Sequence, residues 1–576
     1  MNTSGYYTIK STEVPTQVYE DQKPGTSGLR KKTKLFETSP GYLENFIQSI
    51  FNSETQLRGK TLVLGGDGRY LNRSAIQTIC QMAAANGIRR VWIGQDGLLS
   101  TPAVSCIIRR RENGIAEGGI ILTASHNPGG PEHDFGIKYN LSNGGPAPST
   151  VTERIYVETK QLRTYRIAHL PPINLHMIKD NHFQVDGKPF SVEIISSTED
   201  YLQMLDEIFD WTLLKQLFKR KDFSFKFDAL NGVAGPYAEE IFGNRLSVAA
   251  EHLMGCKPLE DFGGLHPDPN LTYATALVKT MGLHSDGSED SSVSTPPSFG
   301  AATDGDADRA MILGERFFVS PSDSLALMCY YSDQIPFFKK EGGLRSVARS
   351  MPTSRAVDSL ASSKGWQLSE TPTGWKYFCT LMDSEDHTPL ICGEESFGAG
   401  SNHIREKDGL WAILMWLSIL ALHNQDVDEA LVGVGSIVKE YWKMHGRNYY
   451  VRFDYEGCES TKAKTVMQHL RTLNASNASN ALHLTNSYIF EYHDPIDGSV
   501  ATNQGHILEM SDGSRIVFRL SGTSSTGATI RMYLESPEST NFLQSPLVAM
   551  EDLINKALAL SRLPELTGFT KPTNIA

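Results

Sequence analysis

A hydroxyl, an imidazole and a helix breaker stand close together in the segment Thr-Ala-Ser-His-Asn-Pro-Gly-Gly, residues 123–130. The segment follows the apolar run Gly-Gly-Ile-Ile-Leu, which is typical of a buried strand. Because Pro128 and the two glycines after it disfavour a helix, the strand should end in a bent, exposed loop. We therefore expect this loop to present the hydroxyl of Ser125, next to His126, as a nucleophile.

Three carboxylates alternate in the segment Asp-Gly-Asp-Ala-Asp, at Asp304, Asp306 and Asp308. A turning backbone can aim alternate side chains at one point, and a cation that prefers oxygen ligands relieves their repulsion. An EF-hand calcium loop is one alternative, since Glu315 falls at its twelfth position, but Arg309 stands where that loop needs a glycine. A solvated acidic turn is the other alternative. The sequence favours Mg²⁺, which commonly binds phosphate oxygen as well.

Two segments mix hydroxyls, glycines and cations. Residues 519–531 follow a predicted strand and place hydroxyls and glycines between two arginines, and residues 24–32 have a similar mixture. Backbone N–H groups, hydroxyl donors and a guanidinium suit a phosphate dianion. On residue types alone, a plain turn explains the first segment as well, and a flexible arm explains the second.

Polar side chains also precede the apolar helix expected over 410–422, in the segments 393–398 and 403–409. Carboxylates and hydroxyls can hydrogen-bond sugar hydroxyls, and the cations that follow can contact a phosphate or a reacting hydroxyl. The alternative is a charged loop that caps the helix. Lys138 stands on an otherwise apolar strand. It is either an edge charge or a proton carrier whose pKa a neighbouring cation lowers.

An α/β fold must position these segments. From residue 61 the chain alternates strands (61–64, 91–93, 119–122) with helices (about 74–87 and 102–111). This alternation predicts right-handed crossovers and a parallel sheet covered on both faces, with ligands at the carboxyl ends of its strands. It recurs over 224–302 and 345–370, whereas the tail, with a hairpin around Asp512-Gly513 and a helix over 549–560, is α+β.

The 576 residues are too many for one hydrophobic core. We predict four domains: 1–200 with the Ser125 loop, 201–328 with the metal loop, 329–435 with the sugar loop, and 436–576 with the phosphate loop. Two polar tracts, 285–298 and 474–480, are predicted surface insertions because they contain too few apolar residues to order themselves.

The net charge of -12 argues against a general affinity for nucleic acid or acidic membranes. The seven cysteines form no C-x-x-C pair, which favours reduced thiols over a disulfide framework or a zinc site. The sequence contains neither a signal-peptide core nor an apolar run long enough to span a bilayer. We therefore expect a cytoplasmic protein without integral membrane association, as a monomer or weak dimer.

In this order, the segments 123–130, 304–309, 393–398, 403–409 and 519–523 resemble those of the α-D-phosphohexomutase superfamily, and most closely the eukaryotic, parafusin-like phosphoglucomutases. The resemblance extends from Asp21 to the C-terminal helix. It implies four domains around a central cleft: three related α/β mixed-sheet modules and a C-terminal α+β domain. It also implies an isomerase of carbohydrate metabolism that interconverts glucose 1-phosphate and glucose 6-phosphate through a phosphoserine, with glucose 1,6-bisphosphate as intermediate and activator.

By this resemblance Ser125 is the phosphorylated serine, and its phosphate shares the Mg²⁺ with the three aspartates. The groups expected near the reacting atoms are Arg30, His126, Lys138, Arg309, His403 and Lys407. Among these, Lys138 and Lys407 are the candidates for proton transfer. The expected substrate contacts are Thr26, Ser27, Thr373, Gly374, Glu394 and Ser396, together with Arg519, Ser521, Thr523, Ser525, Gly527 and Arg531 around the phosphate that does not react.

Three residues depart from the usual pattern of the family, which has glycine and asparagine where this chain has Ala307 and Ala310, and glycine in place of Ser524. Alanine at 307 is a mild change unless that residue needs a positive φ angle. A non-catalytic scaffold, a phosphomannomutase and a glucose 1,6-bisphosphate synthase are alternative functions. The intact Ser125-His-Asn favours a catalyst, and Glu394-Glu-Ser-Phe-Gly resembles the glucose type.

Overall fold

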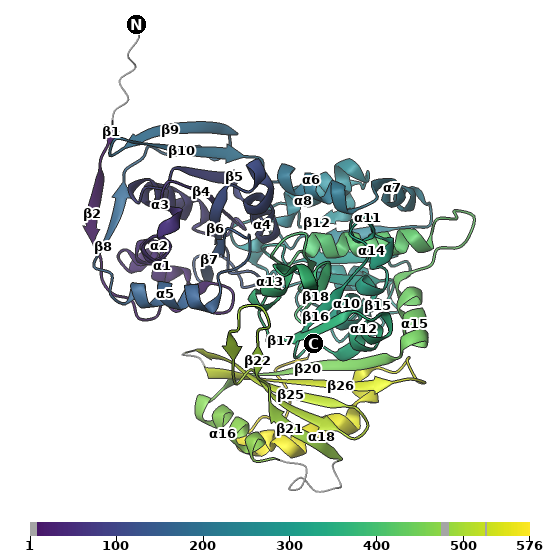
Figure 1. Ribbon diagram of the computed structural model, residues 1–576. Coiled ribbons are helices and arrows are strands. Elements are labelled where there is room, and N and C mark those ends of the chain that lie inside the picture. Colours follow the sequence, from purple (N-terminus) through teal and green to yellow (C-terminus); the bar gives the residue numbers. More distant parts are fainter. Residues whose placement is uncertain (1–7, 474–482, 525–526, 576) are drawn as a thin grey trace.

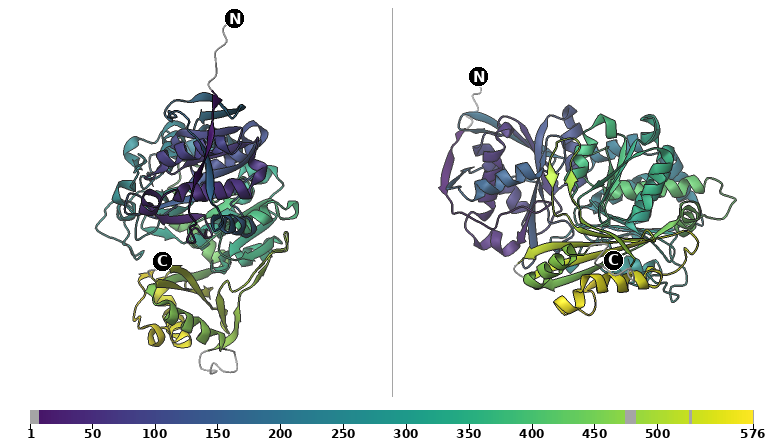
Figure 2. Two further views of the ribbon diagram at one scale, coloured as in Figure 1. Left: turned by 90° about the vertical axis from the view of Figure 1, so that its left-hand side faces the viewer. Right: turned by 60° about the horizontal axis from the view of Figure 1, so that its bottom comes forward.

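The computed structural model describes residues 8–473, 483–524 and 527–575, and the side chains of 522–524 are not described. Four large sheets follow one another along the chain. Figure 1 shows the first sheet with its helices on the left, the second and third on the right, and the C-terminal sheet below. The left view of Figure 2 places the C-terminal sheet at the opposite end of the molecule from the first sheet.

The first sheet has eight strands, and its middle is parallel. Its order is β1 (Thr8–Ile9), β9 (Lys179–Val185), β10 (Lys188–Ile195), β5 (Arg90–Leu98), β4 (Thr61–Gly66), β6 (Ala116–Leu122), β7 (Asp134–Leu141) and β3 (Leu29–Lys32). A small antiparallel ribbon, β2 (Ser11–Pro15) with β8 (Thr164–Ala168), lies beside it.

Helices cover both faces of this sheet, as predicted. Alternation along the strands directs Leu62 and Leu64 into one core, with α2 (Tyr42–Ser53), α3 (Asn72–Ala85) and α5 (Ser149–Thr159). Val63 and Trp92 point into another core, with α4 (Thr101–Arg110) and α6 (Glu199–Ile208). This second core continues into the next two sheets, so the first three modules pack through one hydrophobic interior.

The second and third sheets repeat the plan of the first. The strand order of the second sheet is β12 (Leu253–Met254), β11 (Phe225–Asp228), β13 (Phe299–Thr303), β14 (Ala310–Gly314) and β15 (Phe317–Val319). The strand order of the third sheet is β17 (Gln367–Thr371), β16 (Ser346–Ser350), β18 (Leu390–Gly393) and β19 (Ala399–Ser401). In each of the three sheets an outer parallel strand (β6, β13 or β18) turns back into an antiparallel neighbour (β7, β14 or β19). The predicted segments 123–130, 304–309 and 393–398 lie at these turns.

One helix, α14 (Gly409–His423), is apolar around nearly its whole circumference and is buried between the second and third modules. Its neighbours include α7 (Trp211–Lys219), α10 (Pro321–Tyr330), β14 and β19. Further helices complete these modules: α8 (Ala234–Ala238), α9 (Thr275–Thr280), α11 (Pro336–Lys340), α12 (Asp358–Lys364), α13 (Lys376–Met382) and α15 (Val434–His445).

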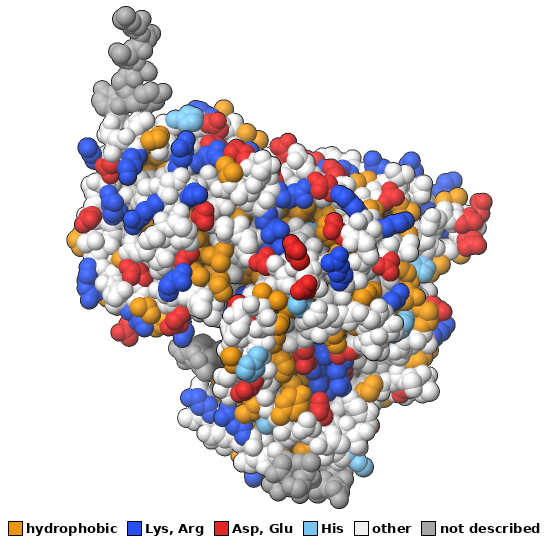
Figure 3. All heavy atoms as spheres, viewed as in Figure 1, with side chains coloured by type: hydrophobic (Ala, Val, Ile, Leu, Met, Phe, Trp, Pro, Cys, Tyr) orange, Lys and Arg blue, Asp and Glu red, His pale blue; other side chains and the backbone are white. Residues whose placement is uncertain are grey.

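The C-terminal part is α+β, as predicted. Its antiparallel sheet has the order β21 (Leu484–Ile489), β24 (His506–Met510), β25 (Arg515–Ser524), β26 (Gly527–Glu538), β20 (Arg447–Cys458), β27 (Asn574–Ile575), and α16 (Ser460–Arg471), α18 (Glu551–Ser561) and α19 (Leu563–Thr567) share its core. The hairpin around Asp512-Gly513 joins β24 to β25. Figure 3 shows a notch in the outline between this part and the first module.

The two polar tracts have different outcomes. Residues 285–298 form a surface loop without helix or strand, as predicted, and the carboxylates of Asp286 and Asp290 accept hydrogen bonds from the backbone N–H groups of Ser288 and Ser292. Residues 474–480 lie outside the described residues. All seven cysteines are free thiols.

Replacing a buried leucine in the central helix should destabilise the molecule. Leu414 is fully buried in α14, so Leu414→Ala leaves a cavity that costs about 2–5 kcal/mol. We expect a lower apparent melting temperature in a thermal scan. Val427→Ala is the control, because Val427 is 67% exposed and should leave the melting temperature unchanged. Equal melting temperatures for the two variants would contradict a central packing role for α14.

Candidate active site

Ser125 lies in the turn after β6, with a positive φ of 54°. Its hydroxyl donates a hydrogen bond to Oδ2 of Asp304 over 2.8 Å, and Nδ1 of His126 lies 3.3 Å away. The predicted bend is therefore present, but the predicted exposure is wrong, since Ser125 is 0% exposed. The turn of the second sheet packs against this loop, so the hydroxyl faces a carboxylate instead of solvent.

Two residues that the sequence analysis missed fix the backbone of Ser125. Arg69 is fully buried and donates to the Ser125 carbonyl over 2.8 Å. Nε of Arg69 also donates to both carboxylate oxygens of Asp67. The hydroxyl of Thr123 donates to Asp67 and accepts the Ser125 N–H over 2.8 Å. The signal was available, because Asp67 directly follows β4, a parallel neighbour of β6, and strand ends of this kind lie together.

The three predicted aspartates form a compact buried cluster. Ligand oxygens of Asp304, Asp306 and Asp308 all lie within 4.8 Å of one another, and the three residues are at most 1% exposed. Neighbouring modules hold the turn: the Thr101 N–H donates to the Asp306 carbonyl over 3.1 Å, and the Gly409 N–H donates to the Ala307 carbonyl over 3.1 Å. A solvated acidic turn is thereby excluded, and strands β13 and β14 on either side exclude an EF-hand.

The donor set of this cluster fits a hard divalent cation. Oδ1 of Asp306 is buried and has no hydrogen-bond partner or ion pair among the described residues, whereas Oδ1 of Asp308 lies 3.1 Å from Nζ of Lys407. Unpaired carboxylate oxygens of this kind are ligands of Mg²⁺. Burial, and then the charges of the other two aspartates, raise the pKa of Asp304 well above its usual value. Ala307 has a φ of 62°, so this alanine does occupy the region that glycine adopts more easily.

Cations from three elements surround the cluster. Nζ of Lys138 lies 2.7 Å from Asp306 and 3.3 Å from Asp308, and Nζ of Lys407 lies 3.1 Å from Asp308. Nε of Arg309 lies 3.9 Å from carboxylate oxygens of both Asp304 and Asp308. The acidic cluster is therefore charge-compensated within the fold.

Lys138 is neither an edge charge nor a lysine with a lowered pKa. It is 4% exposed on β7, which lies between β6 and β3 in the sheet. Burial alone would lower the pKa of Lys138, but the charges of Asp306 and Asp308 outweigh it and raise that pKa. The shift is opposite to the one that the proton-carrier hypothesis requires.

His126 and Arg30 lie in the same buried, positively charged surroundings. Burial lowers the pKa of His126 well below its usual value, and the charges of Arg309 and Arg30 lower it further. The ring of His126 stacks 6.3 Å from that of His266. Burial lowers the pKa of Arg30 as well, and the charge of Arg309 lowers it further. A neutral imidazole therefore lies beside the Ser125 hydroxyl.

The side chain of His403 is held by partners within the protein, and its place near the reacting groups stays a prediction. Its side chain is 1% exposed, Nε2 lies 3.0 Å from Asp408 and Nδ1 lies 2.7 Å from the Ser401 hydroxyl. Its ring stacks on Trp411 with centroids 5.2 Å apart. Asp408 caps the N-terminus of α14 by accepting the Trp411 N–H. His403 thus supports the start of α14, because both of its ring nitrogens are engaged within the protein.

The predicted sugar-binding residues of the third module come together. Oε1 of Glu394 accepts the Gly374 N–H over 2.8 Å, and burial raises the pKa of Glu394. Oγ1 of Thr373 is buried without a hydrogen-bond partner among the described residues, and Ser396 is half-buried. A buried unpaired hydroxyl beside a carboxylate is available to a polar ligand.

A small cavity joins the N-terminal segment to the cations. Its volume is about 30 Å³, and its walls include Thr26, Ser27, Lys138, Lys407 and Asp308. Residues 24–32 are therefore not a free arm, since they contribute β3 and pack against the cluster.

The predicted phosphate loop is the hairpin of β25 and β26, so a turn and a cationic surface occur together. Arg519 and Arg531 are directly opposite each other in the register. Arg519 donates to the Gln504 carbonyl over 3.2 Å, and Nε of Arg531 lies 3.6 Å from Asp454. Ser521 pairs with Thr529 and Gly527 has a φ of 118°. Ser525 and the side chain of Thr523 lie outside the described part of the chain.

Family models match nearly the whole chain. Domains I, II and III of phosphoglucomutase/phosphomannomutase, described as alpha/beta/alpha, match residues 21–166, 199–316 and 321–434, and the phosphoglucomutase-1 C-terminal domain matches 447–573. The chain belongs to the phosphoglucomutase/phosphomannomutase family.

Named relatives within this family cover the full length. A cytoplasmic phosphoglucomutase of Mesembryanthemum crystallinum is 50% identical over 99% of this chain and 100% of its own, and that of Solanum tuberosum is 50% identical over 98% and 99%. A crystal structure of Paramecium pp63/parafusin is similar to this chain, with a TM-score of 0.91 at 48% identity over 99% of this chain and 100% of that one. Its title describes an exocytosis-sensitive phosphoprotein and phosphoglucomutase in an open form. Among the described residues, no helix has the length and apolar character to cross a membrane.

Thr101, which the sequence analysis did not single out, orients one of the metal-ligand candidates. Its hydroxyl donates to Oδ2 of Asp306 over 2.7 Å, next to Lys138. Outer-shell partners of this kind tune metal affinity. The sequence did offer a signal for Thr101: it begins α4, at the carboxyl ends of the strands of the first sheet, where ligand-binding residues gather.

Removing the Thr101 hydroxyl should weaken cation binding. Thr101→Val keeps the shape of the side chain but leaves Oδ2 of Asp306 without this donor, so we expect divalent-cation affinity to fall about 10- to 100-fold. Calorimetric titration with Mn²⁺ measures the change. Thr212→Val, at an exposed position on α7, is the control. Unchanged Mn²⁺ affinity in Thr101→Val would contradict a role of this hydroxyl in orienting Asp306 for a cation.

Proposed function

We propose that this protein is a phosphoglucomutase, which interconverts glucose 1-phosphate and glucose 6-phosphate. The observation that carries the proposal is the 2.8 Å hydrogen bond from the Ser125 hydroxyl to Asp304, inside a buried cluster of three carboxylates. A nucleophilic oxygen next to a cation site is the arrangement that phosphoryl transfer needs. Relatives at about 50% identity carry the name phosphoglucomutase, which supports the same activity.

The reaction consists of two transfers of a phosphoryl group. In the first, the bond between phosphorus and Oγ of phosphorylated Ser125 breaks, and a bond to the 6-hydroxyl oxygen of glucose 1-phosphate forms. That hydroxyl loses its proton, and Oγ of Ser125 gains one. The product, glucose 1,6-bisphosphate, then reorients in the site so that its 1-phosphate faces Ser125. In the second transfer the bond between phosphorus and the C1 oxygen breaks and a bond to Oγ of Ser125 forms. Oγ loses its proton, the C1 oxygen gains one, and glucose 6-phosphate leaves.

Mg²⁺ would be held by Asp304, Asp306 and Asp308 together with the phosphate on Ser125. Bound there, it would supply positive charge to phosphoryl oxygens. Arg30, Arg309 and Lys407 provide further positive charge from the protein, which matters because phosphoryl transfer depends mainly on positioning and electrostatic stabilisation.

The remaining groups divide between positioning and proton transfer. Lys138, paired with two aspartates, keeps the cluster in place, so Lys407 is the better of the two candidates for moving a proton at the sugar hydroxyl. His126 lies against the Ser125 hydroxyl as a neutral hydrogen-bond partner. Thr26 and Ser27 border the same space as Lys407.

Two sites outside the reacting centre would hold the ends of the sugar phosphate. Thr373, Gly374, Glu394 and Ser396 are the proposed contacts to sugar hydroxyls. The proposed phosphate contacts on the hairpin are Arg519, Ser521, Thr523, Ser525, Gly527 and Arg531. Burial alone would lower the pKa of Arg519, but Tyr533 and then Glu395 and Glu394 outweigh it and raise that pKa, so Arg519 stays positively charged for a phosphate.

A scaffold without mutase activity, a phosphomannomutase and a glucose 1,6-bisphosphate synthase are the competing functions. The Paramecium structure carries both an exocytosis-sensitive phosphoprotein and a phosphoglucomutase in its title, so a second role is compatible with activity. The retained Ser125, its aspartate partner and the cations favour a catalyst. We place the activity in the cytoplasm, as in the names of most of the relatives, in a monomer or weak dimer that binds phosphosugars and no nucleic acid.

Replacing the nucleophile should abolish turnover. We expect Ser125→Ala to lower the rate of glucose 6-phosphate formation by at least about 10³-fold and to prevent labelling of the protein by ³²P-glucose 1,6-bisphosphate. Ser362→Ala, on the surface of α12, is the control. Wild-type protein that takes up label but is inert towards glucose 1-phosphate, mannose 1-phosphate and 1,3-bisphosphoglycerate would rule out all three enzyme functions.

Chelation tests the cation separately. Removing divalent ions with EDTA should stop phosphoryl transfer without unfolding the protein, because Lys138, Lys407 and Arg309 still compensate the aspartates. Mg²⁺ should restore the rate in the mutase assay, while circular dichroism stays constant throughout. Full activity in excess EDTA would contradict a metal-dependent mechanism.

A further inference from the structure

A second polar pocket lies on the opposite edge of the first sheet from Ser125. Its walls include Arg58 and Arg89, which precede β4 and β5, and Lys188 at the start of β10. The three strands are parallel, so the pocket is at their amino ends, whereas Ser125 follows the carboxyl end of β6. The six residues of β4 separate the two edges by about 20 Å.

We propose that this amino-end pocket binds a small molecule that carries two or more phosphate groups. Its volume of about 730 Å³ lies in the range of small-molecule sites, roughly 300–1,000 Å³. One inorganic phosphate would fill only a small part of that space and could not contact cations on several sides. A ligand with separated phosphate groups can do so.

Charge is the first argument for an anionic ligand. The wall contains four cations, Arg58, Arg89, Arg166 and Lys188, and two carboxylates, Glu13 and Asp186. This excess is local, because the chain as a whole has a net charge of -12, and charges of both signs are interspersed over the face drawn in Figure 3. Clustered arginine and lysine side chains around a hollow favour phosphate ligands.

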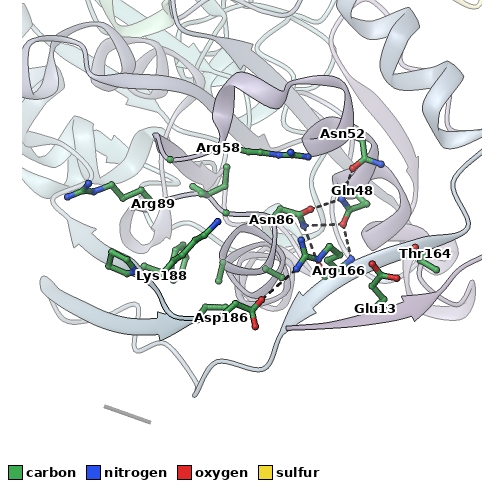
Figure 4. A pocket seen from close by; sticks show the side chains of 18 residues that line it. Glu13, Gln48, Asn52, Arg58, Asn86, Arg89, Thr164, Arg166, Asp186 and Lys188 are labelled. Carbon is green, nitrogen blue, oxygen red and sulfur yellow. Dashed lines mark hydrogen bonds and ion pairs between the residues drawn. The ribbon is translucent and has the colours of Figure 1, made fainter. Parts of the chain in front are cut away.

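The cations are also available. Arg58, Arg89 and Lys188 are exposed and have no side-chain hydrogen bond or ion pair within the described ranges 8–473, 483–524 and 527–575. Arg166 is partly neutralised by Asp186 at 3.6 Å. Figure 4 shows the Lys188 side chain extending towards the middle of the pocket and Arg58 lying across from it, with Asn86 between them, while Arg89 points away along the rim.

The floor of the pocket is polar, and its side chains are hydrogen-bonded to one another. Gln48 donates to Asn52 over 2.9 Å and to Asn86 over 2.7 Å, and Asn86 donates back to Gln48 over 3.0 Å (Figure 4). The C-terminal end of α3 would by itself repel an anion. Asn86 reduces that effect, since its backbone N–H and its side-chain amide both donate to the Met82 carbonyl.

The test combines localisation with a paired substitution. With inorganic tripolyphosphate as the probe, hydrogen–deuterium exchange of the full-length protein should show protection in peptides that contain residues 84–90 and 186–191. Calorimetry should show that the double variant Arg58→Ala/Lys188→Ala binds tripolyphosphate at least tenfold more weakly at these residues. Neither side chain has a hydrogen-bond or ion-pair partner in the described part of the chain, so the variant should fold.

Lys215→Ala/Lys219→Ala is the matched control, because it removes the same charge from exposed positions on α7. It should bind tripolyphosphate as the wild type does. Protection confined to residues around Asp304 or to the hairpin of 519–531, unchanged affinity in the Arg58/Lys188 variant, or an equal loss in the control would each overturn the proposal. Mutase activity is measured independently, so this result does not depend on the proposed function.

Discussion

The structure depends on compensating three carboxylates that are buried within 4.8 Å of one another. Burying charges of one sign costs several kcal/mol per ion unless opposite charges accompany them. The compensating groups come from different modules: Lys138 from the first sheet, Arg309 from the turn of the second, and Lys407 from the segment that precedes α14. The acidic cluster therefore fixes how the first three modules sit on one another, in addition to any role in binding a cation.

A repeated piece of topology places the reactive groups at this junction. Each of the first three sheets has a parallel strand that turns back into an antiparallel neighbour, and the turns contain Ser125, the three aspartates and Glu394. The backbone also links the second and third of these turns, since the Ala310 N–H donates to the Phe397 carbonyl and Arg309 forms a β-bridge with Gly398. Three similar modules thus contribute three chemically different turns to one junction: one with a serine hydroxyl, one with a cluster of carboxylates and one with a polar, glutamate-containing segment.

The sequence predicted the strands, the module order and the acidic cluster, because hydrophobic periodicity and closely spaced carboxylates are local signals. It did not predict properties that depend on contacts between modules. Ser125 was expected to be exposed and is buried because Asp304 comes from another sheet. His403 is engaged by Asp408, and the pKa of Lys138 is raised by Asp306, 168 residues away in the sequence. Spacing along the chain carries no information about such partners.

The C-terminal sheet is attached by a different kind of contact. Arg515, at the start of β25, is 4% exposed and pairs with Glu370 of the third sheet at 2.9 Å and with Glu535 of β26 at 3.0 Å. Arg349 of β16 pairs with the same Glu370 at 2.6 Å. Buried ion pairs add little net stability compared with apolar packing, but their geometry is directional. Arg519 lies further along the same strand as Arg515, so the position of the strand that carries Arg519 depends on this interface with the third sheet.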